Sequence, residues 1–189
     1  SALSIDRSVT VKAIAVNKKG KTSFVTTAVY KKIPHNYTVN YLTKYEKQYD
    51  GGGPDGLIDG LRGTINWRKG NWQGYQKTDM DVVIDLKAIK QVSKISIDFL
   101  QDTRAWIIMP KKLVIETSLD GKNFTQLYSA EDFLPIEKLD PQIMILEPSF
   151  AAVKARYVRI KAIQYGKLPE WHLGAGGDSH IFVDEVEIK

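Results

Sequence analysis

Hydrophobic and polar residues alternate along most of the chain, in short runs separated by turn-forming residues. The first two runs, residues 8–16 and 22–31, flank the turn 17–21 and predict a β-hairpin. No segment keeps a helical period of 3.6 residues over several turns. Many short strands with turns between them predict an all-β sandwich or barrel-like fold. The strands expected after the hairpin are residues 36–42, 81–86, 92–100, 112–118, 124–128, 142–146, 155–163 and 180–188.

A domain boundary is expected near residues 33–36, where Pro34 ends the hairpin. A β-hairpin alone is only marginally stable in water. We therefore expect residues 1–33 either to pack against the following domain or to be the end of another domain. Residues 36–189 are long enough to form one domain with its own hydrophobic core.

Residues 59–75 follow no strand or helix pattern and are predicted to form a long ordered loop. The stretch contains an Asp59-Gly60 turn, oxygen-bearing side chains and the aromatic residues Trp67, Trp72 and Tyr75. Ordering so many residues costs conformational entropy, which bound metal or tertiary packing has to offset. The loop is therefore predicted to be functional or metal-stabilised.

The tryptophans are distributed unlike the other large apolar residues. Trp67, Trp72, Trp106 and Trp171 all lie in or beside predicted loops, whereas Val, Ile, Leu, Phe and Tyr fill the predicted strands. The loops of a β-sandwich gather at its two ends, so several tryptophans are expected on one rim. Flat aromatic faces there would suit sugar rings, bases or cationic ligands.

The composition excludes several classes of function. The net charge of +5 comes from lysines and arginines scattered along the chain, which argues against a nucleic-acid partner and against membrane insertion. No apolar run approaches the roughly 20 residues that span a bilayer. The chain has no cysteine, so disulfides, thiolate metal sites and cysteine catalysis are excluded. There is no signal-peptide pattern, and we expect the sequence to be part of a longer protein.

Five segments, in order along residues 36–189, resemble the discoidin family, also called the coagulation-factor type C domain, and within it the family 32 carbohydrate-binding modules. The resemblance implies an eight-stranded antiparallel jelly-roll-like sandwich with ligand-binding loops at one end. The segments are Asp59-Gly60 with Thr64 and Trp67, then residues 81–86, 118–124, 155–160 and 184–188.

A narrower resemblance is to the C-terminal module of bacterial family 20 glycoside hydrolases, the β-N-acetylhexosaminidases. It is carried by residues 63–75, by 99–102 with Trp106-Ile107, and by Trp171-His172 with 182–185. The hairpin, through Val11-Lys12-Ala13, resembles the end of the fibronectin-like domain that precedes such modules. The resemblance implies a non-catalytic module of a secreted, periplasmic or cell-surface enzyme. Its partners would be an N-acetylhexosamine or galactose-type glycan and the catalytic domain of the same polypeptide.

The family resemblance also implies a structural Ca²⁺ site. Carboxylates of Asp59 and Glu185 and the hydroxyl of Thr64 would bind the ion, together with backbone carbonyls. Calcium takes six to eight hard oxygen ligands in flexible geometry, which such a loop can provide. The alternative is an ordinary Asp-Gly turn with an exposed glutamate. The carbonyl ligands implied are those of Gly56, Leu61 and Asp184.

Five residues are the candidate sugar ligands: Trp72, Arg104, Trp106, Trp171 and His172. The tryptophans would stack on a sugar face, while the guanidinium and the imidazole would orient hydroxyl groups. Each has an alternative. Arg104 could form a surface ion pair with Asp102, and residues 171–172 could be a hydrophobic plug. Trp67 is expected to pack beneath the loop.

Three rival functions remain open. The module could pack on its catalytic domain without binding free sugar, or bind protein or phospholipid through apolar loop tips ringed by basic residues. An enzyme is not expected, because Asp79 and Asp81 would lie on one element rather than face each other across a cleft as glycosidase carboxylates do. A single-strand nucleic-acid binder using Trp67-Arg68-Lys69 would need more concentrated positive charge.

Overall fold

A computed structural model describes residues 4–189 and divides the chain into two compact units, with the boundary between His35 and Asn36. In the first unit, strands β1 (Val9–Ala13) and β2 (Thr26–Tyr30) pair antiparallel, which confirms the predicted hairpin. The side chain of Asn17 accepts hydrogen bonds from the backbone of Lys19 and Lys21 and so fixes the connecting turn. The kind of domain to which this hairpin belongs stays a prediction.

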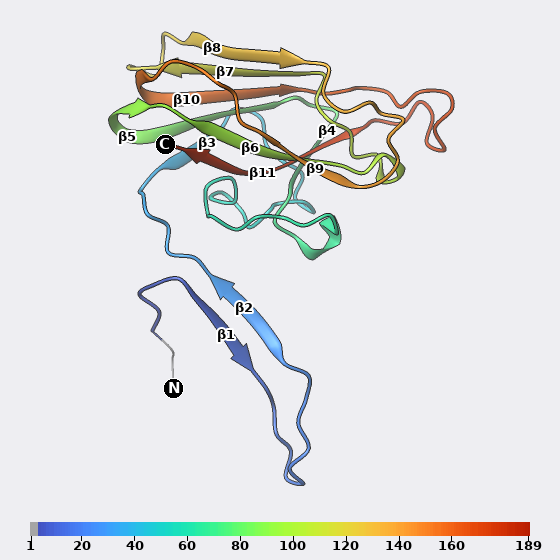
Figure 1. Ribbon diagram of the computed structural model, residues 1–189. Coiled ribbons are helices and arrows are strands. Elements are labelled where there is room, and N and C mark those ends of the chain that lie inside the picture. Colours follow the sequence, from blue (N-terminus) through green and yellow to red (C-terminus); the bar gives the residue numbers. More distant parts are fainter. Residues whose placement is uncertain (1–3) are drawn as a thin grey trace. The chain divides into compact units, whose positions relative to one another are not determined.

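The second unit is a sandwich of two antiparallel sheets (Figure 1). One sheet has the order β3-β5-β10-β7-β8 and the other the order β4-β11-β6-β9. The all-β prediction is confirmed. The strands are β3 (Thr38–Tyr41), β4 (Gln73–Gln76), β5 (Met80–Val92), β6 (Ile95–Gln101), β7 (Lys112–Ser118), β8 (Thr125–Glu131), β9 (Gln142–Leu146), β10 (Val153–Ile163) and β11 (His180–Ile188).

This unit has nine strands where the sequence predicted eight. The additional strand is β4, which lies in the stretch predicted as a loop and pairs with β11 from Val183↔Gln73 to His180↔Gln76. Its residues Gln73, Gly74 and Tyr75 are all buried, so the sequence shows no alternation there. The helical elements of the described residues are two 3-10 turns, η1 (Trp67–Lys69) and η2 (Thr103–Ala105). No helix in residues 4–189 has the length and apolarity to cross a membrane.

The core lies between the two sheets and follows the two-residue period of the strands. On β5, Met80, Val82, Ile84 and Leu86 are buried, while the residues between them lie at partly exposed positions. Alternate residues of β7 and β10 meet the same core, against Ile97, Phe99 and Val183 of the other sheet, among others. Each large aliphatic side chain buried in this way stabilises the fold by about 1.5–3 kcal/mol.

The four-stranded sheet is covered on its outer face as well. Every residue of β6 is buried, and so are residues 181–186 of β11, although a strand of a two-layer sandwich usually alternates. The cover is the long segment before β4, which runs below β11 in Figure 1. Side chains of Trp72, Leu100 and Phe182 form a second hydrophobic cluster under this segment.

Trp72 is part of this cover and is not a ligand residue. Its side chain is 2% exposed, and its indole Nε1 donates a hydrogen bond to the Thr64 carbonyl at 2.9 Å. A Cβ added to Gly63 would come within 2.3 Å of the indole, so the loop backbone lies directly on the ring. The predicted role of Trp72 in sugar stacking is wrong, because β4 pairs with β11 and holds the preceding residue under the loop.

Replacing Trp72 tests this placement against that of another loop tryptophan. We expect Trp72→Ala to lower the free energy of unfolding by about 3–5 kcal/mol, since it leaves a cavity and removes a buried hydrogen bond. Trp171→Ala is the matched control, because its side chain is 51% exposed, and its expected effect is about 0.5 kcal/mol or less. Denaturant unfolding of both variants measures the difference. Equal destabilisation by the two substitutions would contradict the structure.

Candidate functional site

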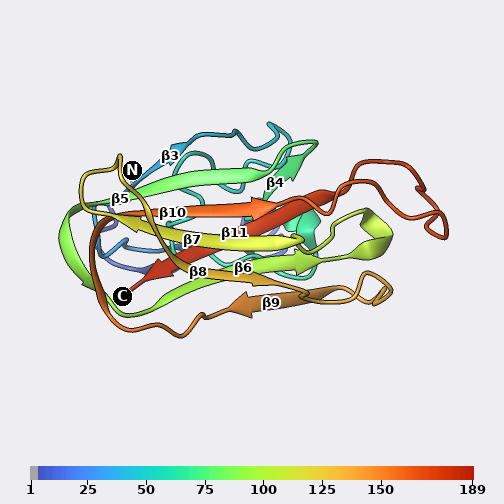
Figure 2. The same ribbon diagram turned by 90° about the horizontal axis from the view of Figure 1, so that it is seen from above.

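Three connections meet at one end of the sandwich (Figure 2): residues 102–111, 132–141 and 164–179. Backbone hydrogen bonds join the first to β11, since the N–H of His180 donates to the Trp106 carbonyl at 2.8 Å and the N–H of Ile108 to the His180 carbonyl at 3.0 Å. The hydroxyl of Thr103 donates to the Ile136 carbonyl at 2.9 Å and so joins the first connection to the second. This loop end is the place where the family resemblance puts ligands.

His172 fixes the third connection to the first. Its side chain is 6% exposed, with Nε2 2.7 Å from the Thr103 carbonyl. A carbonyl can only accept, so Nε2 carries the proton, and Nδ1 is then free to accept from the N–H of Gly174 at 2.9 Å. Both ring nitrogens are occupied within the protein. The prediction that His172 orients a sugar hydroxyl is therefore wrong, and its role is to position the loop.

Trp106 supports the loop rather than offering an open platform. It has a left-handed backbone conformation, with φ of 68°, directly after η2. A Cβ on Gly174 would lie 2.4 Å from the Trp106 ring and one on Gly177 2.7 Å, so glycine backbone covers the indole. The ring also packs against the hydrophobic cluster that contains Ile108. The glycine backbone leaves no room for a sugar on the covered part of the ring, and since Trp106 is only partly buried, its stacking role stays a prediction for the rest.

Trp171 and Arg104 are the predicted ligand residues that remain exposed. Trp171 is 51% exposed, and its indole lies 5.7 Å from the His172 ring, measured between centroids. Arg104 is exposed as well and forms no ion pair with Asp102 in the described part of the chain. The hydrogen bond between His172 and the Thr103 carbonyl joins the two loops. Trp171 precedes His172 and Arg104 follows Thr103, so both come to the same rim.

A groove of about 570 Å³ lies beside this rim and was not predicted. Lys111 and Phe133 are among its lining residues, together with Tyr165. The ammonium of Lys111 lies 5.4 Å from the centroid of the Tyr165 ring, within reach of a cation–π interaction. A sequence signal for this groove exists, since Tyr165 stands at the start of the loop 164–179, but a tyrosine there is a weaker sign of an aromatic platform than the loop tryptophans are.

Trp67 packs beneath the long loop, as expected. Its ring makes edge-to-face contacts with Tyr49 and Phe182, each at 5.9 Å between centroids. The guanidinium of Arg68 lies 4.0 Å above the indole. Trp67 therefore belongs to the cluster that supports the loop, beside Trp72.

The residues of the implied calcium site anchor the long loop to β11. Asp59 accepts a hydrogen bond from the N–H of Leu61 at 2.7 Å, and Glu185 accepts one from the N–H of Gly60 at 2.7 Å. The carboxylate of Asp184 accepts from the N–H of Gly63. Glu185 sits at a β-bulge, where the pairing of β11 with β6 shifts register between Asp184 and Val186.

Burial places these carboxyl groups in an unusual electrostatic state. Loss of hydration raises the pKa of Asp184 from 3.8 to about 7 and that of Glu185 from 4.5 to about 8, and it also raises the pKa of Asp59. The negative charge of Asp59 adds to the effect on both residues of β11. One oxygen of Asp184 and one of Asp98 are buried without a hydrogen-bond partner. Negative charge in this region exceeds what Arg62, the cation that pairs with Asp98, can balance.

The remaining candidate residues, Thr64 for calcium and the pair Asp79 and Asp81 for catalysis, have contacts within the protein. Thr64 is exposed, and its hydroxyl donates weakly to the Asn66 carbonyl at 3.3 Å. Asp79 accepts a hydrogen bond from the N–H of Gln164 at 2.8 Å. Asp81 accepts two hydrogen bonds from the guanidinium of Arg159, at 2.8 and 2.7 Å. Both carboxylates thus have structural partners.

Comparison with known proteins identifies the family. A model of the F5/8 type C domain matches residues 40–175. A comparison with curated proteins finds no match. The chain resembles a family 32 carbohydrate-binding module from a family 31 glycoside hydrolase of Clostridium perfringens, with a TM-score of 0.55, 15% identity and coverage of 84% of this chain and 97% of the other.

Two similar structures contain sugars. One is chitosan-binding module 2 of a chitosanase/glucanase from Paenibacillus sp. IK-5 in complex with chitotriose, with a TM-score of 0.52, 18% identity and coverage of 83% and 98%. The other is the family 32 module of C. perfringens NanJ in complex with galactose, with a TM-score of 0.51, 18% identity and coverage of 80% and 92%. At these identities the likeness establishes the fold. The family model matches most of the sandwich unit of this chain, and the chain therefore belongs to the F5/8 type C domain family.

Proposed function

We propose that this chain is a non-catalytic carbohydrate-binding module whose sugar site is the rim formed by Trp171 and Arg104. The observation that carries the proposal is a half-exposed indole at residue 171 and an exposed guanidinium at residue 104, which forms no ion pair in the described part of the chain, on two loops that the buried His172 holds together. A rigid pair of this kind binds with little loss of conformational entropy.

The chemistry of the two side chains fits a neutral sugar. The apolar face of a pyranose ring can pack on the Trp171 indole, and the planar guanidinium of Arg104 can donate to neighbouring hydroxyl groups. The Tyr165 groove beside the rim would hold a second sugar unit. The ligand class we propose is an N-acetylhexosamine or galactose-type glycan. A shallow rim with few contacts corresponds to a Kd in the micromolar to millimolar range, about −8 to −4 kcal/mol.

We also propose that the module belongs to a secreted bacterial glycoside hydrolase of the β-N-acetylhexosaminidase type. The support is the resemblance of residues 63–75, 99–102 and 182–185 to the C-terminal modules of such enzymes. The partner in the same polypeptide would be the catalytic domain. Linking a weak sugar site to that domain raises the effective concentration of substrate near the catalytic centre.

One observation favours a second candidate, a membrane-binding role. Leu173 is completely exposed and lies two residues from Trp171 on the same loop, with the basic side chains of Arg104 and Lys111 nearby in the loop end. Exposed apolar loop tips with basic neighbours can bind anionic lipid surfaces. We favour the sugar because the buried His172 joins the two loops that carry Arg104 and Trp171, whereas a lipid surface requires no such fixed arrangement of loops.

Binding of sugar at the rim is tested by titration. We expect galactose, N-acetylglucosamine or chitotriose to change the tryptophan fluorescence of the chain saturably. Trp171→Ala should abolish this change, and Arg104→Ala should weaken binding by about tenfold, because one contact of about 1.4 kcal/mol is lost. Ile145→Ala, an equally exposed position on β9, is the control and should bind as the unaltered chain does. Undiminished affinity of Trp171→Ala would contradict the proposal, and binding only to phosphatidylserine vesicles would favour the second candidate.

We further propose that the long loop binds a structural Ca²⁺. Asp59 and Glu185 would supply carboxylate oxygens, and Thr64 with the carbonyls of Gly56, Leu61 and Asp184 the rest; the ion would neutralise the buried negative charge. In residues 4–189, no group of three or more acidic or histidine side chains is arranged to hold a metal, so backbone oxygens are essential to this site. The raised pKa values of the carboxyl groups on β11 fit a region that lacks a cation.

The calcium proposal has a pH-dependent consequence. Without divalent cations the folded chain retains protons on Asp184 and Glu185 that the unfolded chain releases above about pH 4. The free energy of unfolding should therefore fall as the pH rises from about 5 to about 8 in chelator. Millimolar Ca²⁺ should raise the melting temperature at pH 8 and flatten this profile.

Thermal unfolding from pH 5 to 8, in EDTA and in Ca²⁺, measures both effects. Glu185→Gln should lose most of the response to Ca²⁺, whereas Glu147→Gln, an exposed partner of Lys94 on the surface, should keep it. A melting temperature that is the same in EDTA and in Ca²⁺ would contradict the calcium site.

A further inference from the structure

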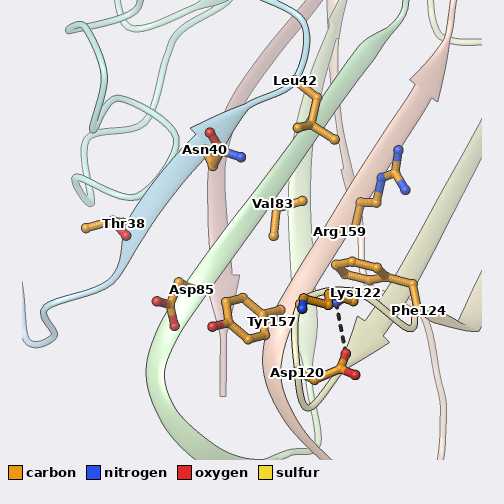
Figure 3. A pocket seen from close by; sticks show the side chains of 11 residues that line it. Thr38, Asn40, Leu42, Val83, Asp85, Asp120, Lys122, Phe124, Tyr157 and Arg159 are labelled. Carbon is orange, nitrogen blue, oxygen red and sulfur yellow. Dashed lines mark hydrogen bonds between the residues drawn. The ribbon is translucent and has the colours of Figure 1, made fainter.

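The outer face of the five-stranded sheet carries a hollow that none of the loop-end residues line (Figure 3). Its volume is about 570 Å³, within the usual size range of ligand pockets. The floor comes from β3, β5 and β10, and one wall is formed by the turn between β7 and β8. The hollow is therefore separate from the loop-end site.

Strand register builds the floor of this hollow. Thr38, Asp85 and Tyr157 form one cross-strand row, because Thr38 pairs with Asp85 and Asp85 with Tyr157. Asn40, Val83 and Arg159 form the next row. Residues between these positions, such as Ile84 and Val158, face the core, so the period of the strands turns both rows outward.

The wall is held close to the floor by a glycine. Gly121 has a φ of 74°, and a Cβ at this position would lie 3.2 Å from the Tyr157 ring. A side chain at this position would therefore make a tight contact with the ring, and it would also have to adopt a left-handed backbone conformation that favours glycine. Phe124 continues the wall, and the guanidinium of Arg159 lies 5.7 Å from its ring centroid. Aromatic surfaces thus stand on one side of the hollow, next to a polar floor (Figure 3).

The charged groups of the hollow already have partners. Asp85 pairs with Arg156 at 3.1 Å, and Arg159 pairs with Asp81 at 2.7 Å. Hydrogen bonds within its own turn, first from the N–H of Asn123, lower the pKa of Asp120 and stabilise its charge. Two carboxylates and two cations line the hollow, so their formal charges cancel. Of the four charged side chains, two are held in ion pairs, and the charge of Asp120 is stabilised by the neutral donors of its own turn, so the hollow offers little net charge to a charged ligand.

The polar groups that remain available are neutral. In the described residues, neither the amide of Asn40 nor the hydroxyl of Tyr157 forms a hydrogen bond with another side chain or with the backbone. The amide offers donors and acceptors on one planar group, and the hydroxyl offers one more donor. Val83 provides an apolar patch between them. Aromatic surfaces on one side, the apolar patch of Val83 in the floor and neutral hydrogen-bonding groups together match the alternating apolar and hydroxyl surfaces of a sugar.

We propose that this hollow is a second carbohydrate-binding site, for an uncharged sugar unit that packs on Val83, Phe124 and Tyr157 and hydrogen-bonds to Asn40. The site shares the ligand class of the proposed function but none of its residues. The two sites lie on different surfaces, so one glycan chain or two neighbouring chains can engage the module at two points, which raises avidity. Each site can accordingly fail its test without the other.

Residue-resolved NMR titration of the whole chain separates the two sites. Galactose, N-acetylglucosamine and chitotriose are the probes, and the backbone amides of residues 40, 83 and 157 report on the hollow, while those of 104 and 171 report on the loop end. We expect saturable shifts in both groups with at least one sugar. Trp171→Ala should abolish the loop-end shifts and leave those of the hollow unchanged.

Substitutions in the hollow complete the test. Asn40→Ala removes an exposed side chain without a structural partner, and it should weaken binding at the hollow about tenfold. Val83→Lys should abolish that binding by filling the floor, whereas Val114→Lys, outward on β7 but outside the hollow, should have no effect. The proposal is overturned if no sugar shifts the amides of residues 40, 83 and 157, or if these shifts survive Val83→Lys in a folded chain. If no sugar shifts the loop-end amides of the unaltered chain while those of the hollow do shift, the proposed function is overturned instead.

Discussion

The carboxylates of Asp59, Asp184 and Glu185 fix a segment that has almost no regular structure of its own. Their oxygens accept from backbone N–H groups of residues 61, 63 and 60, and the carbonyl of Leu57 accepts from the N–H of Val186 at 2.6 Å. These carboxylate bonds are part-buried, and an N–H group that leaves water without a partner is costly, so the bonds determine where the loop can lie. The covering of the four-stranded sheet depends on them, and so does the burial of Trp72.

The loop end depends on the same kind of contact. His172 satisfies one carbonyl and one N–H with a single neutral ring, and glycine backbone packs on Trp106. Polar side chains that are fully bonded inside the protein order a loop without help from a helix or strand. What they leave exposed, Trp171 and Arg104, is therefore presented in a fixed arrangement. On the sheet face, strand pairing performs this positioning, and no loop is needed except the turn at Gly121.

Most of the fold could be predicted from the sequence because strand formation follows a local pattern. The bounds of β9 and β11 agree with the predicted runs residue for residue, since both stand between clear turn signals. Strand β5 extends to Val92 and is longer than predicted. The extension could not be predicted, because residues 87–91 are all exposed and show no alternation of buried and exposed positions. Its extension is stabilised by β10, whose Val153 pairs with Val92, and such a contact is not visible in local sequence.

The candidate site could be predicted only in part. The sequence places Trp106, Trp171, His172 and Arg104 in loops, and the structure brings these loops together. The sequence does not reveal which side chains become buried, because a tryptophan is equally suited to a core or to a rim. Trp72 and Trp171 differ only in what covers them. The neutral groups of the sheet-face hollow could not be predicted for another reason: Asn40 and Tyr157 lie on strands, and strand pairing between distant segments brings them to one surface.

Amide hydrogen exchange is the most direct measurement of the central claim, that buried polar side chains hold both irregular segments rigid. The N–H groups of Gly60, Gly63 and Gly174 are bonded to Glu185, Asp184 and His172. We expect these three amides to exchange as slowly as amides of the central strands β6 and β11. Exchange of the same amides at the rate of the exposed turn around Gly20 would contradict it.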